Sequence, residues 1–486
     1  MKRDFTVSAA WNTAGGWIEQ AVTAVNFLVI ARLVGVEAFG IAAMAFAFLF
    51  LGEFLVRDTL TEAIVERRSL EDGRLEATFV GLIGFSLVVV VALVVISQVA
   101  AKAYGQPSVG PLLLAASPTV LMIGAAGVST ALLRRQLAYR ALAIRTVLGV
   151  MAGGGVGMIM AFYDFGAWSL VGQRLTEVGI NSITAFIAAG WTPKRWPRRG
   201  DFALLRGLGP KVVLLRSVTL VIAQTPTVAL GFFAEPRAAG LFAFAWRLVE
   251  IVRSLIAKPM QGVAQSVIAA MRREHAATDE FLLDLSNLAA WATFPAFVGL
   301  ALISDPLIEL LLGRDWRAAA PTLSILCIAG AVSALTAVQE AYLLARDRVE
   351  AFVRASAFEA AIGIVIVALA SAYGPAAAAA AVVARTLALL PLRTTAALTP
   401  EGIAPARLVR AIASPLLAAA GMSVPVALWR IAALGRVSDA IFVASAIVIG
   451  VATVGVFLFG LMPGAVARLR TFLHASAERP PADSKS

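Results

Sequence analysis

Residues 77–103 read ATFVGLIGFSLVVVVALVVISQVAAKA, and their one charged side chain, Lys102, lies at the end. At about 1.5 Å per residue, a helix of this length crosses a hydrocarbon core of roughly 30 Å. Similar apolar stretches recur along the chain of 486 residues, of which 60% are hydrophobic and 15% charged, with a mean hydropathy of +0.85. Soluble globular domains have a more polar composition. The sequence therefore predicts an all-α polytopic membrane protein.

Turn signals such as Gly35, Asp72-Gly73 and Gly374-Pro375 divide the chain into about fourteen predicted transmembrane helices. These helices are residues 6–33, 39–65, 77–103, 110–133, 141–163, 167–191, 204–234, 238–268, 284–312, 318–344, 350–373, 376–398, 406–432 and 438–466. The first stretch contains Glu19 and is too long for a cleaved signal peptide, so we expect it to be a membrane helix.

Lys and Arg side chains near the loops fall mainly on one side of this topology. Arg134-Arg135 and Arg198-Arg199 lie on that side, whereas the other side holds few basic residues, among them Arg436. Basic loops resist translocation, so the basic side and both termini are predicted to be cytoplasmic. The formal charge of +11 comes from short clusters instead of one basic face, so no nucleic-acid partner is expected.

Two pairs of segments resemble each other and indicate an internal repeat. The junction at 35–40 resembles 234–240, and 132–142 resembles 343–353. Helices 1–6 and 7–12 are therefore expected to be two copies of one unit in the same orientation. The predicted organisation is an N-lobe of helices 1–6 at 1–191, a cytoplasmic linker at 192–203, a C-lobe of helices 7–12 at 204–398, helices 13–14 at 399–468 and a disordered cytoplasmic tail at 469–486.

The sequence offers few residues for covalent or metal chemistry. It has one cysteine, Cys327, and two histidines, His275 and His474, and it lacks the glycine-rich loop that holds nucleotide phosphates. We therefore predict no catalytic residues, no metal site and no cofactor, and a protein that is not an enzyme.

Charged side chains inside the predicted helices concentrate on helices 1, 2, 7 and 8, which are equivalent in the two repeats. A charge at membrane depth costs at least about 2.5 kcal/mol and usually faces water or a partner, so we expect these helices to line a central cavity. The predicted substrate-binding residues, for phosphate and sugar, are Arg57, Lys211, Arg216, Arg247, Arg253 and Lys258. The predicted polar or coupling residues of the cavity are Glu19, Glu53, Asp58, Gln224, Glu250 and Gln261.

The cationic side chains of helices 7 and 8 outnumber the carboxylate of Glu250, which favours an anionic ligand. Arginine suits phosphate because its planar guanidinium offers paired donors and stays charged. The alternative is that these side chains are neutralising pairs that hold helices together. The pairs considered are Glu53 with Arg57, Arg174 with Glu177, and Glu250 with Arg247 and Arg253. Lys211 and Lys258 could instead extend towards the cytoplasmic surface.

Glycine and proline residues, such as Gly153 to Gly155 and Pro226, interrupt several predicted helices. They could be points about which two lobes rock, or small residues that let helices pack closely. Both interpretations stay open from the sequence.

Four stretches resemble the polysaccharide transporter (Wzx-type oligosaccharide flippase) family of the multidrug/oligosaccharidyl-lipid/polysaccharide exporter superfamily. They are RLVGVEAFGIAAMA at 32–45, LRRQLAYRAL at 133–142, GAWSLV at 166–171 and LGRDWRAAAP at 312–321. The resemblance implies two six-helix lobes in a V around a central cavity, with two C-terminal helices offering a groove for a lipid tail. It also implies a location in the bacterial inner membrane.

By this resemblance, the protein is expected to be a flippase that moves an undecaprenyl-pyrophosphate-linked oligosaccharide repeat unit from the cytoplasmic to the periplasmic leaflet. The expected mechanism is alternating access, in the synthesis of exopolysaccharide, capsule or O-antigen. The expected partners are the lipid-linked oligosaccharide and the membrane, with a polysaccharide polymerase or export complex as a candidate.

Two other functions are considered. A cation-coupled drug antiporter of the same superfamily would need an acidic cavity, whereas the cationic side chains of helices 7 and 8 are in excess. A glycan polymerase or ligase usually has a sizeable periplasmic loop, and the predicted periplasmic loops here are short.

Overall fold

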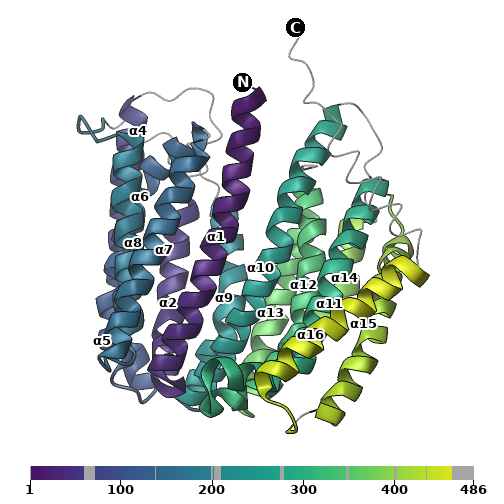
Figure 1. Cartoon of the computed structure of the whole chain (residues 1–486). Helices are drawn as coiled ribbons and strands as arrows, with labels where there is room; N and C mark the ends of the chain where they lie inside the picture. Colours follow the sequence, from purple (N-terminus) through teal and green to yellow (C-terminus); the bar gives the residue numbers. More distant parts are fainter. Residues whose placement is uncertain are drawn as a thin grey trace. The chain divides into compact units, whose positions relative to one another are not determined.

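The computed structural model describes residues 2–59, 72–136, 138–198, 201, 210–273, 279–345, 350–398, 402–433 and 435–461 (Figure 1). Two compact units divide the chain: unit 1 is Met1–Ala243 and unit 2 is Phe244–Ser486. This division falls inside one helix. The lobe boundaries predicted at 191 and 204 stay a prediction, and the predicted tail at 469–486 lies outside the described residues.

Unit 1 contains nine helices or parts of helices within the described ranges. They are α1 (Lys2–Val34), α2 (Val36–Thr59), α4 (Asp72–Ala103), α5 (Val109–Ala116), α6 (Pro118–Arg135), α7 (Tyr139–Phe162), α8 (Trp168–Ala189), α9 (Pro210–Phe233) and the beginning of α10 (Pro236–Arg273). Helix α7 packs between α1 and α8, α6 packs against α8 and α4, and α2 packs against α5 and α9.

Unit 2 contains the rest of α10 and the elements that follow it. These are α11 (Asp279–Leu312), the short 3-10 helix η2 (Arg314–Ala319), α12 (Ala320–Ala345), α13 (Glu350–Ser371), α14 (Pro375–Leu398), α15 (Pro405–Ala433), α16 (Asp439–Val456) and the π-helical turn η4 (Phe457–Leu461). Helix α11 is central to this unit because α12, α15 and α16 all pack against it.

The predicted all-α polytopic fold is confirmed, because each of the fourteen predicted segments corresponds to one helix or to two consecutive elements. Within the described ranges, nine segments are long and apolar enough to cross a membrane. The predicted segment 110–133 corresponds to one candidate membrane span, Val109–Arg135, which consists of two consecutive helices: α5 ends at Ala116 and α6 begins at Pro118. Proline lacks the N–H that would continue a helix and is well suited to its first turn, so the break falls there.

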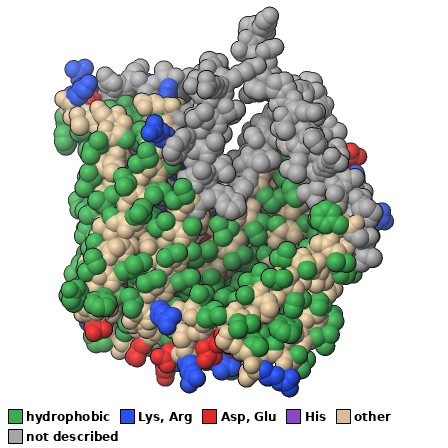
Figure 2. Space-filling view, viewed as in Figure 1, with side chains coloured by type: hydrophobic (Ala, Val, Ile, Leu, Met, Phe, Trp, Pro, Cys, Tyr) green, Lys and Arg blue, Asp and Glu red, His purple; other side chains and the backbone are tan. Residues whose placement is uncertain are grey.

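The surface of the helices fits a lipid environment. On α4, Val88, Val91, Val95 and Val99 are exposed and recur every three or four residues, so they form one apolar face. Figure 2 shows hydrophobic side chains over the middle of the helices on the visible face, with charged side chains gathered at its lower edge. We infer that these faces contact lipid.

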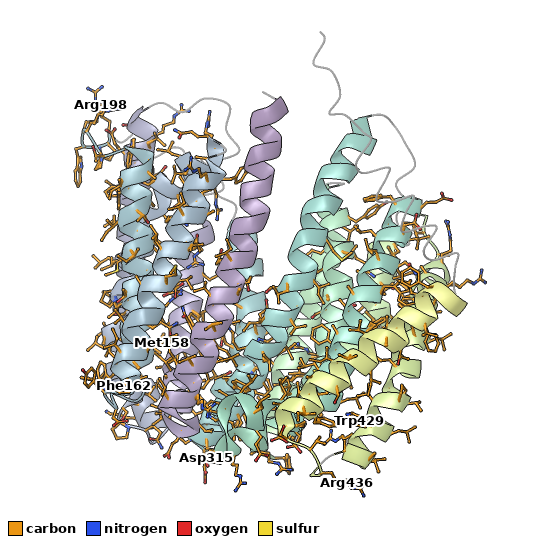
Figure 3. All side chains as sticks on the ribbon, viewed as in Figure 1. Met158, Phe162, Arg198, Asp315, Trp429 and Arg436 are labelled. Atoms are coloured by element: carbon orange, nitrogen blue, oxygen red, sulfur yellow. The ribbon has the colours of Figure 1, made fainter. Side chains whose placement is uncertain are left out.

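Polar contacts hold the predicted linker against the start of α4. The described part of this linker is 192–198 and 201. The buried carboxylate of Glu76 accepts hydrogen bonds from the backbone N–H groups of Lys194 and Arg195, each at 3.0 Å. Arg198 lies at this end of unit 1, and Phe162, on α7, lies towards the other end (Figure 3).

Helix α15 runs parallel to α11 along its length. Near the start of α15, Leu408 packs in a core cluster with Leu282 of α11, and near its end, Met422 packs with Ile303. Asn287 of α11 also donates a hydrogen bond to the carbonyl of Ala411. The C-terminal ends of α11 and α15 therefore lie at the same end of unit 2, where Figure 3 also places Asp315 and Arg436.

Two glycines allow the backbones of α2 and α10 to cross closely within unit 1. A Cβ atom added to Gly240 would lie 3.0 Å from the Cα of Gly40, and one added to Gly40 would lie 3.0 Å from the backbone nitrogen of Gly240. Real Cβ atoms rarely come this close to another backbone. Only glycine fits this crossing without a shift of one helix.

Candidate functional site

Helix α10, which corresponds to predicted helix 8, carries several of the charged side chains that the sequence predicts to face a cavity. Arg247 is exposed, whereas its neighbours Leu248, Val249 and Ile251 are buried. The chain thus buries these apolar side chains of α10 and leaves the arginine beside them exposed, well inside a helix of 38 residues. An arginine in this position points away from the core of unit 2.

One turn further along, Glu250 and Arg253 form a two-fold hydrogen-bonded ion pair. Arg253 Nε donates to Glu250 Oε2 at 2.8 Å, and Nη2 donates to Oε1 at 2.6 Å. The alternative of a local neutralising pair is therefore confirmed for these two residues. The charges of Glu250 and Arg253 cancel each other, and Arg247 is a further cationic side chain on this part of α10.

A second charged cluster lies inside unit 1, where α2, α6 and α8 meet. Arg174 of α8 donates from Nε to Glu53 Oε1 at 3.1 Å and from Nη2 to Oε2, and its Nη1 donates to Glu177 Oε1 at 3.3 Å. Thr119 Oγ1 lies 2.7 Å from Glu53 Oε1, and the guanidinium lies 5.5 Å from the centre of the Phe50 ring. Glu53 is only 2% exposed, so its charge depends on these partners.

Sequence reasoning found the pair of Arg174 with Glu177 but missed the pair of Arg174 with Glu53. The spacing of Arg174 and Glu177 on one helix is visible in the sequence, whereas Glu53 lies 121 residues away. The signal that could have found it is that the nearest charges along the chain, Arg57 and Asp58, offset each other, whereas a buried carboxylate needs a cationic partner of its own.

Next to this cluster, α7 packs closely against α8 through a small residue. A Cβ atom on Gly153 of α7 would lie 2.7 Å from the carbonyl oxygen of Gln173 and 2.8 Å from the Cβ of Glu177, both on α8. On the other side of α7, Asn26 of α1 donates from Nδ2 to the carbonyl oxygen of Val150 at 2.8 Å. For Gly153 the packing interpretation is supported, because α8 lies against the site of a side chain.

The remaining predicted site residues lie as follows. Arg57 is exposed, and Glu19 and Gln224 are half-buried. The side chains of Asp58, Lys211, Arg216, Lys258 and Gln261 lie outside the described side chains, although their backbones are helical. The central cavity between helices of the two repeats stays a prediction.

The described residues contain no group of three or more His, Cys, Asp or Glu side chains that could hold a metal ion. Cys327 is buried among apolar neighbours on α12. The described charged residues can bind a ligand by electrostatic contacts. The exposed guanidinium of Arg247 on α10, for example, can donate paired hydrogen bonds to phosphate oxygens.

Comparisons with known proteins give the relatives of this chain. A family model described as polysaccharide biosynthesis protein matches residues 29–321. Lipopolysaccharide biosynthesis protein WzxC of Escherichia coli (strain K12) is 21% identical over 358 residues, which is 72% of this chain and 71% of that protein. Succinoglycan biosynthesis transport protein ExoT of Rhizobium meliloti (strain 1021) is 22% identical over 305 residues, 62% of this chain and 61% of that protein.

Solved structures with the same fold are also known. The lipid II flippase MurJ, in an inward closed conformation, aligns with a TM-score of 0.78 and 15% identity, covering 94% of this chain and 99% of its own. An inward-facing multidrug resistance transporter of the MATE family aligns with a TM-score of 0.61 and 15% identity, covering 79% of this chain and 95% of its own. At this level of sequence identity, the two similarities show a shared fold.

Proposed function

The chain belongs to the polysaccharide biosynthesis protein family, whose relatives named above are transport proteins and not enzymes, and from this premise we propose that it flips a lipid-linked oligosaccharide across a membrane. The substrate we propose is an undecaprenyl-pyrophosphate-linked oligosaccharide repeat unit. It would move from the cytoplasmic to the periplasmic leaflet of a bacterial inner membrane, with both termini of the protein in the cytoplasm.

The observation that carries this proposal is the exposed Arg247 within α10, next to the neutralised pair of Glu250 and Arg253. An arginine inside a membrane helix is rare and suits an anionic ligand, because pyrophosphate offers several oxygens to a guanidinium. A fold shared with the lipid II flippase over most of both chains supports a lipidic substrate of this kind.

The mechanism we propose is alternating access. The pyrophosphate and sugars enter from the cytoplasm, cationic side chains replace part of their hydration, and the polyprenyl chain remains in lipid. Transport then requires only that the cavity opens in turn to each side. No covalent step is needed.

The test uses a bacterial strain that lacks its own flippase and exports polymer only when this protein is active. Arg247→Ala and Arg216→Ala are each expected to lower export at least about tenfold, because loss of one charge-assisted contact to phosphate weakens binding by that order. Arg247→Lys keeps the charge and should retain part of the export. Polymer on the cell surface is measured together with the amount of protein in the membrane.

Arg436→Ala is the matched control, since Arg436 is exposed in the loop before α16 and far in sequence from α10. It should export as the unmodified protein does. Normal export by both Arg247→Ala and Arg216→Ala would contradict the assignment of the cationic site. A flipping assay in vesicles with a fluorescent lipid-linked oligosaccharide then tests the substrate directly.

A second candidate function is a cation-coupled drug antiporter, and the cluster of Glu53, Arg174 and Glu177 is the observation that favours it. Two carboxylates share one guanidinium there, so one negative charge is not balanced within the cluster. Such a charge can take up a proton or another cation. Increased drug resistance in cells that express the protein, without any change in polymer export, would favour this function.

A further inference from the structure

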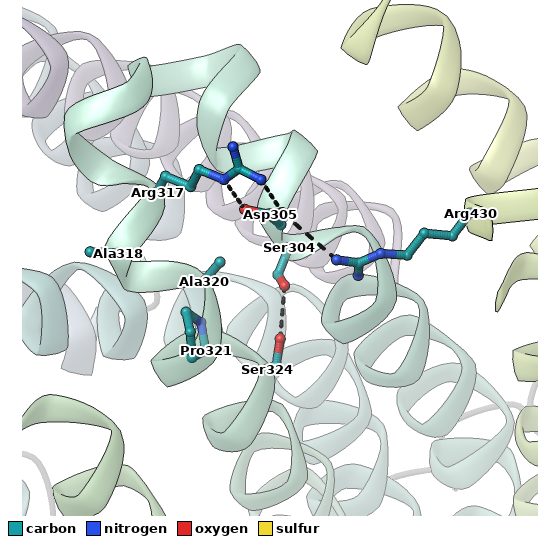
Figure 4. A pocket seen from close by; sticks show the side chains of 8 residues that line it. All are labelled: Ser304, Asp305, Arg317, Ala318, Ala320, Pro321, Ser324 and Arg430. Carbon is teal, nitrogen blue, oxygen red and sulfur yellow. Dashed lines mark hydrogen bonds and ion pairs between the residues drawn. The ribbon is translucent and has the colours of Figure 1, made fainter. Parts of the chain in front are cut away.

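A cavity of about 470 Å³ lies in unit 2, where α11 ends, η2 follows and α12 begins. Its polar lining is formed by Ser304, Asp305, Arg317, Ser324 and Arg430. Figure 4 shows Arg317 and Arg430 reaching towards Asp305 from different elements, η2 and α15. The α10 arginines discussed above are not part of this lining.

Arg430 is fixed at this cavity by an irregularity of α11. Pro306 lies inside α11 and has no N–H, so the carbonyl of Leu302, four residues earlier, lacks its usual helical donor. Arg430 Nη1 supplies a donor at 2.7 Å from that carbonyl oxygen, and its Nη2 lies 3.7 Å from Asp305 Oδ2. The guanidinium is therefore held by acceptors on α11 before any ligand binds.

Arg317 approaches Asp305 from η2. Its Nε donates to Asp305 Oδ1 at 2.8 Å and its Nη2 to Oδ2 at 3.1 Å. Asp305 thus lies between two guanidinium groups. Arg317 Nη1 also lies 3.5 Å from Glu309 Oε2, and Arg314 Nε lies 3.3 Å from Glu309 Oε1. With Glu309 and Arg314 included, three arginines stand against two carboxylates. Because each guanidinium has five N–H donors, donors remain for a further acceptor. An anion would balance the remaining positive charge.

The ends of the candidate membrane spans indicate that the cavity lies near the depth of lipid headgroups. Three candidate membrane spans, Glu280–Leu312, Arg314–Glu340 and Pro405–Ala433, have an end beside it. Ile328 lies one helical turn beyond Ser324 on the same face of α12, and Ile431 follows Arg430 on α15; both are exposed. A ligand here can place a charged group in the cavity and a chain on apolar surface.

We propose that this cavity binds the phosphodiester headgroup of an anionic phospholipid such as phosphatidylglycerol. Arg317 and Arg430 contact the phosphate oxygens. The hydroxyl groups of Ser304 and Ser324, whose oxygens lie 2.7 Å apart, face the glycerol. The acyl chains lie against the apolar side chains next to the cavity. A free phosphate shares the charge of this ligand but lacks its chains.

The experiment measures lipid bound to the purified full-length protein by native mass spectrometry. We expect phosphatidylglycerol to be retained in preference to phosphatidylcholine. Arg317→Gln should lower the bound phosphatidylglycerol about fivefold, the effect of one arginine on binding to an anionic lipid. Arg314→Gln is the matched control: its side chain also belongs to η2 but is 91% exposed and does not line the cavity, so we expect less than about a twofold change.

Ser324→Asp is a second variant that adds a carboxylate to the cavity and leaves the pair of Arg317 and Asp305 in place. It should lose phosphatidylglycerol as Arg317→Gln does. An unchanged thermal midpoint would show that the variant is folded and that only the binding of lipid is lost. Equal retention of the two lipids, or equal effects of Arg317→Gln and Arg314→Gln, would overturn the proposal. If millimolar inorganic phosphate binds to the protein without lipid and displaces phosphatidylglycerol, the assignment of a lipid ligand is overturned.

Discussion

Arg174 and Glu53 show how a charged pair can be tolerated inside a membrane helix bundle. Each terminal atom of the Glu53 carboxylate accepts from the Arg174 guanidinium, and Thr119 adds a hydroxyl group within hydrogen-bond distance. Removing one partner leaves the other charge buried without compensation, whereas removing both leaves an apolar contact. The pair therefore fixes which side chains of α2 and α8 must face each other.

We predict that Arg174→Leu and Glu53→Leu each lower the free energy of unfolding by about 3 kcal/mol, and that the double variant loses less than their sum. The measurement is thermal unfolding of the purified protein in detergent. Arg198→Ala, an exposed substitution in the described part of the linker, is the control and should leave the midpoint unchanged. Strictly additive losses would show that the two side chains are not coupled.

The sequence predicted which charges matter better than it predicted their partners. Glu53, Glu250 and Arg253 were singled out because charge at membrane depth is rare, and all three form ion pairs. Only pairs on one helix can be found from spacing. The contact of Glu53 with Arg174 depends on the packing of α2 against α8, which no local pattern encodes.

At the scale of the helix, α7 illustrates why glycines need not be hinges. The site of a Cβ on Gly153 is occupied by backbone and side-chain atoms of α8, whereas a Cβ on Gly155 would meet nothing within 4 Å. The two residues differ by two positions and so face different sides of the same helix. Gly153 lies in a contact, and Gly155 is open to substitution.

We therefore predict that Gly153→Ala destabilises the protein by about 1 to 3 kcal/mol, because α8 has to shift to admit the methyl group. Gly155→Ala, the matched control, should keep or slightly raise the stability, since alanine favours helix. Both are measured as the thermal midpoint and the yield of monodisperse protein. If Gly155→Ala is the more damaging of the two, the contact does not hold α7 and α8 together.

The helices themselves followed well from the sequence because lipid demands long apolar segments with internal hydrogen bonds. The sequence did not show the interruption within one span: residues 110–133 stay hydrophobic although regular helix is interrupted at Ser117, between α5 and α6. Hydropathy indicates whether a segment lies in lipid or in water, and Ser117-Pro118 shows that it does not indicate where a helix is interrupted.

For the whole molecule, the orientation in the membrane is the prediction with the widest consequences. Arg198 and Arg436 are both exposed, and the distribution of basic residues places them on opposite sides of the membrane. The single native cysteine, Cys327, is only 2% exposed, so it offers little background to a thiol reagent.

In cells with a permeable outer membrane, a membrane-impermeant maleimide should label Arg436→Cys directly and Arg198→Cys only after the inner membrane is lysed. The unmodified protein should remain unlabelled in both conditions. Labelling is read as a mass shift of the purified protein. Labelling of Arg198→Cys in intact cells would reverse the proposed orientation and, with it, the proposed direction of transport.

The crossing of α2 and α10 at Gly40 and Gly240 has an evolutionary consequence. The two glycines occupy matching places in the two segments whose similarity indicates a repeat. If both halves descend from one ancestral gene whose product paired with itself, the two glycines were once a single codon. One mutation would then have put two side chains into the crossing at once, so selection against it would have been strong before the gene was duplicated.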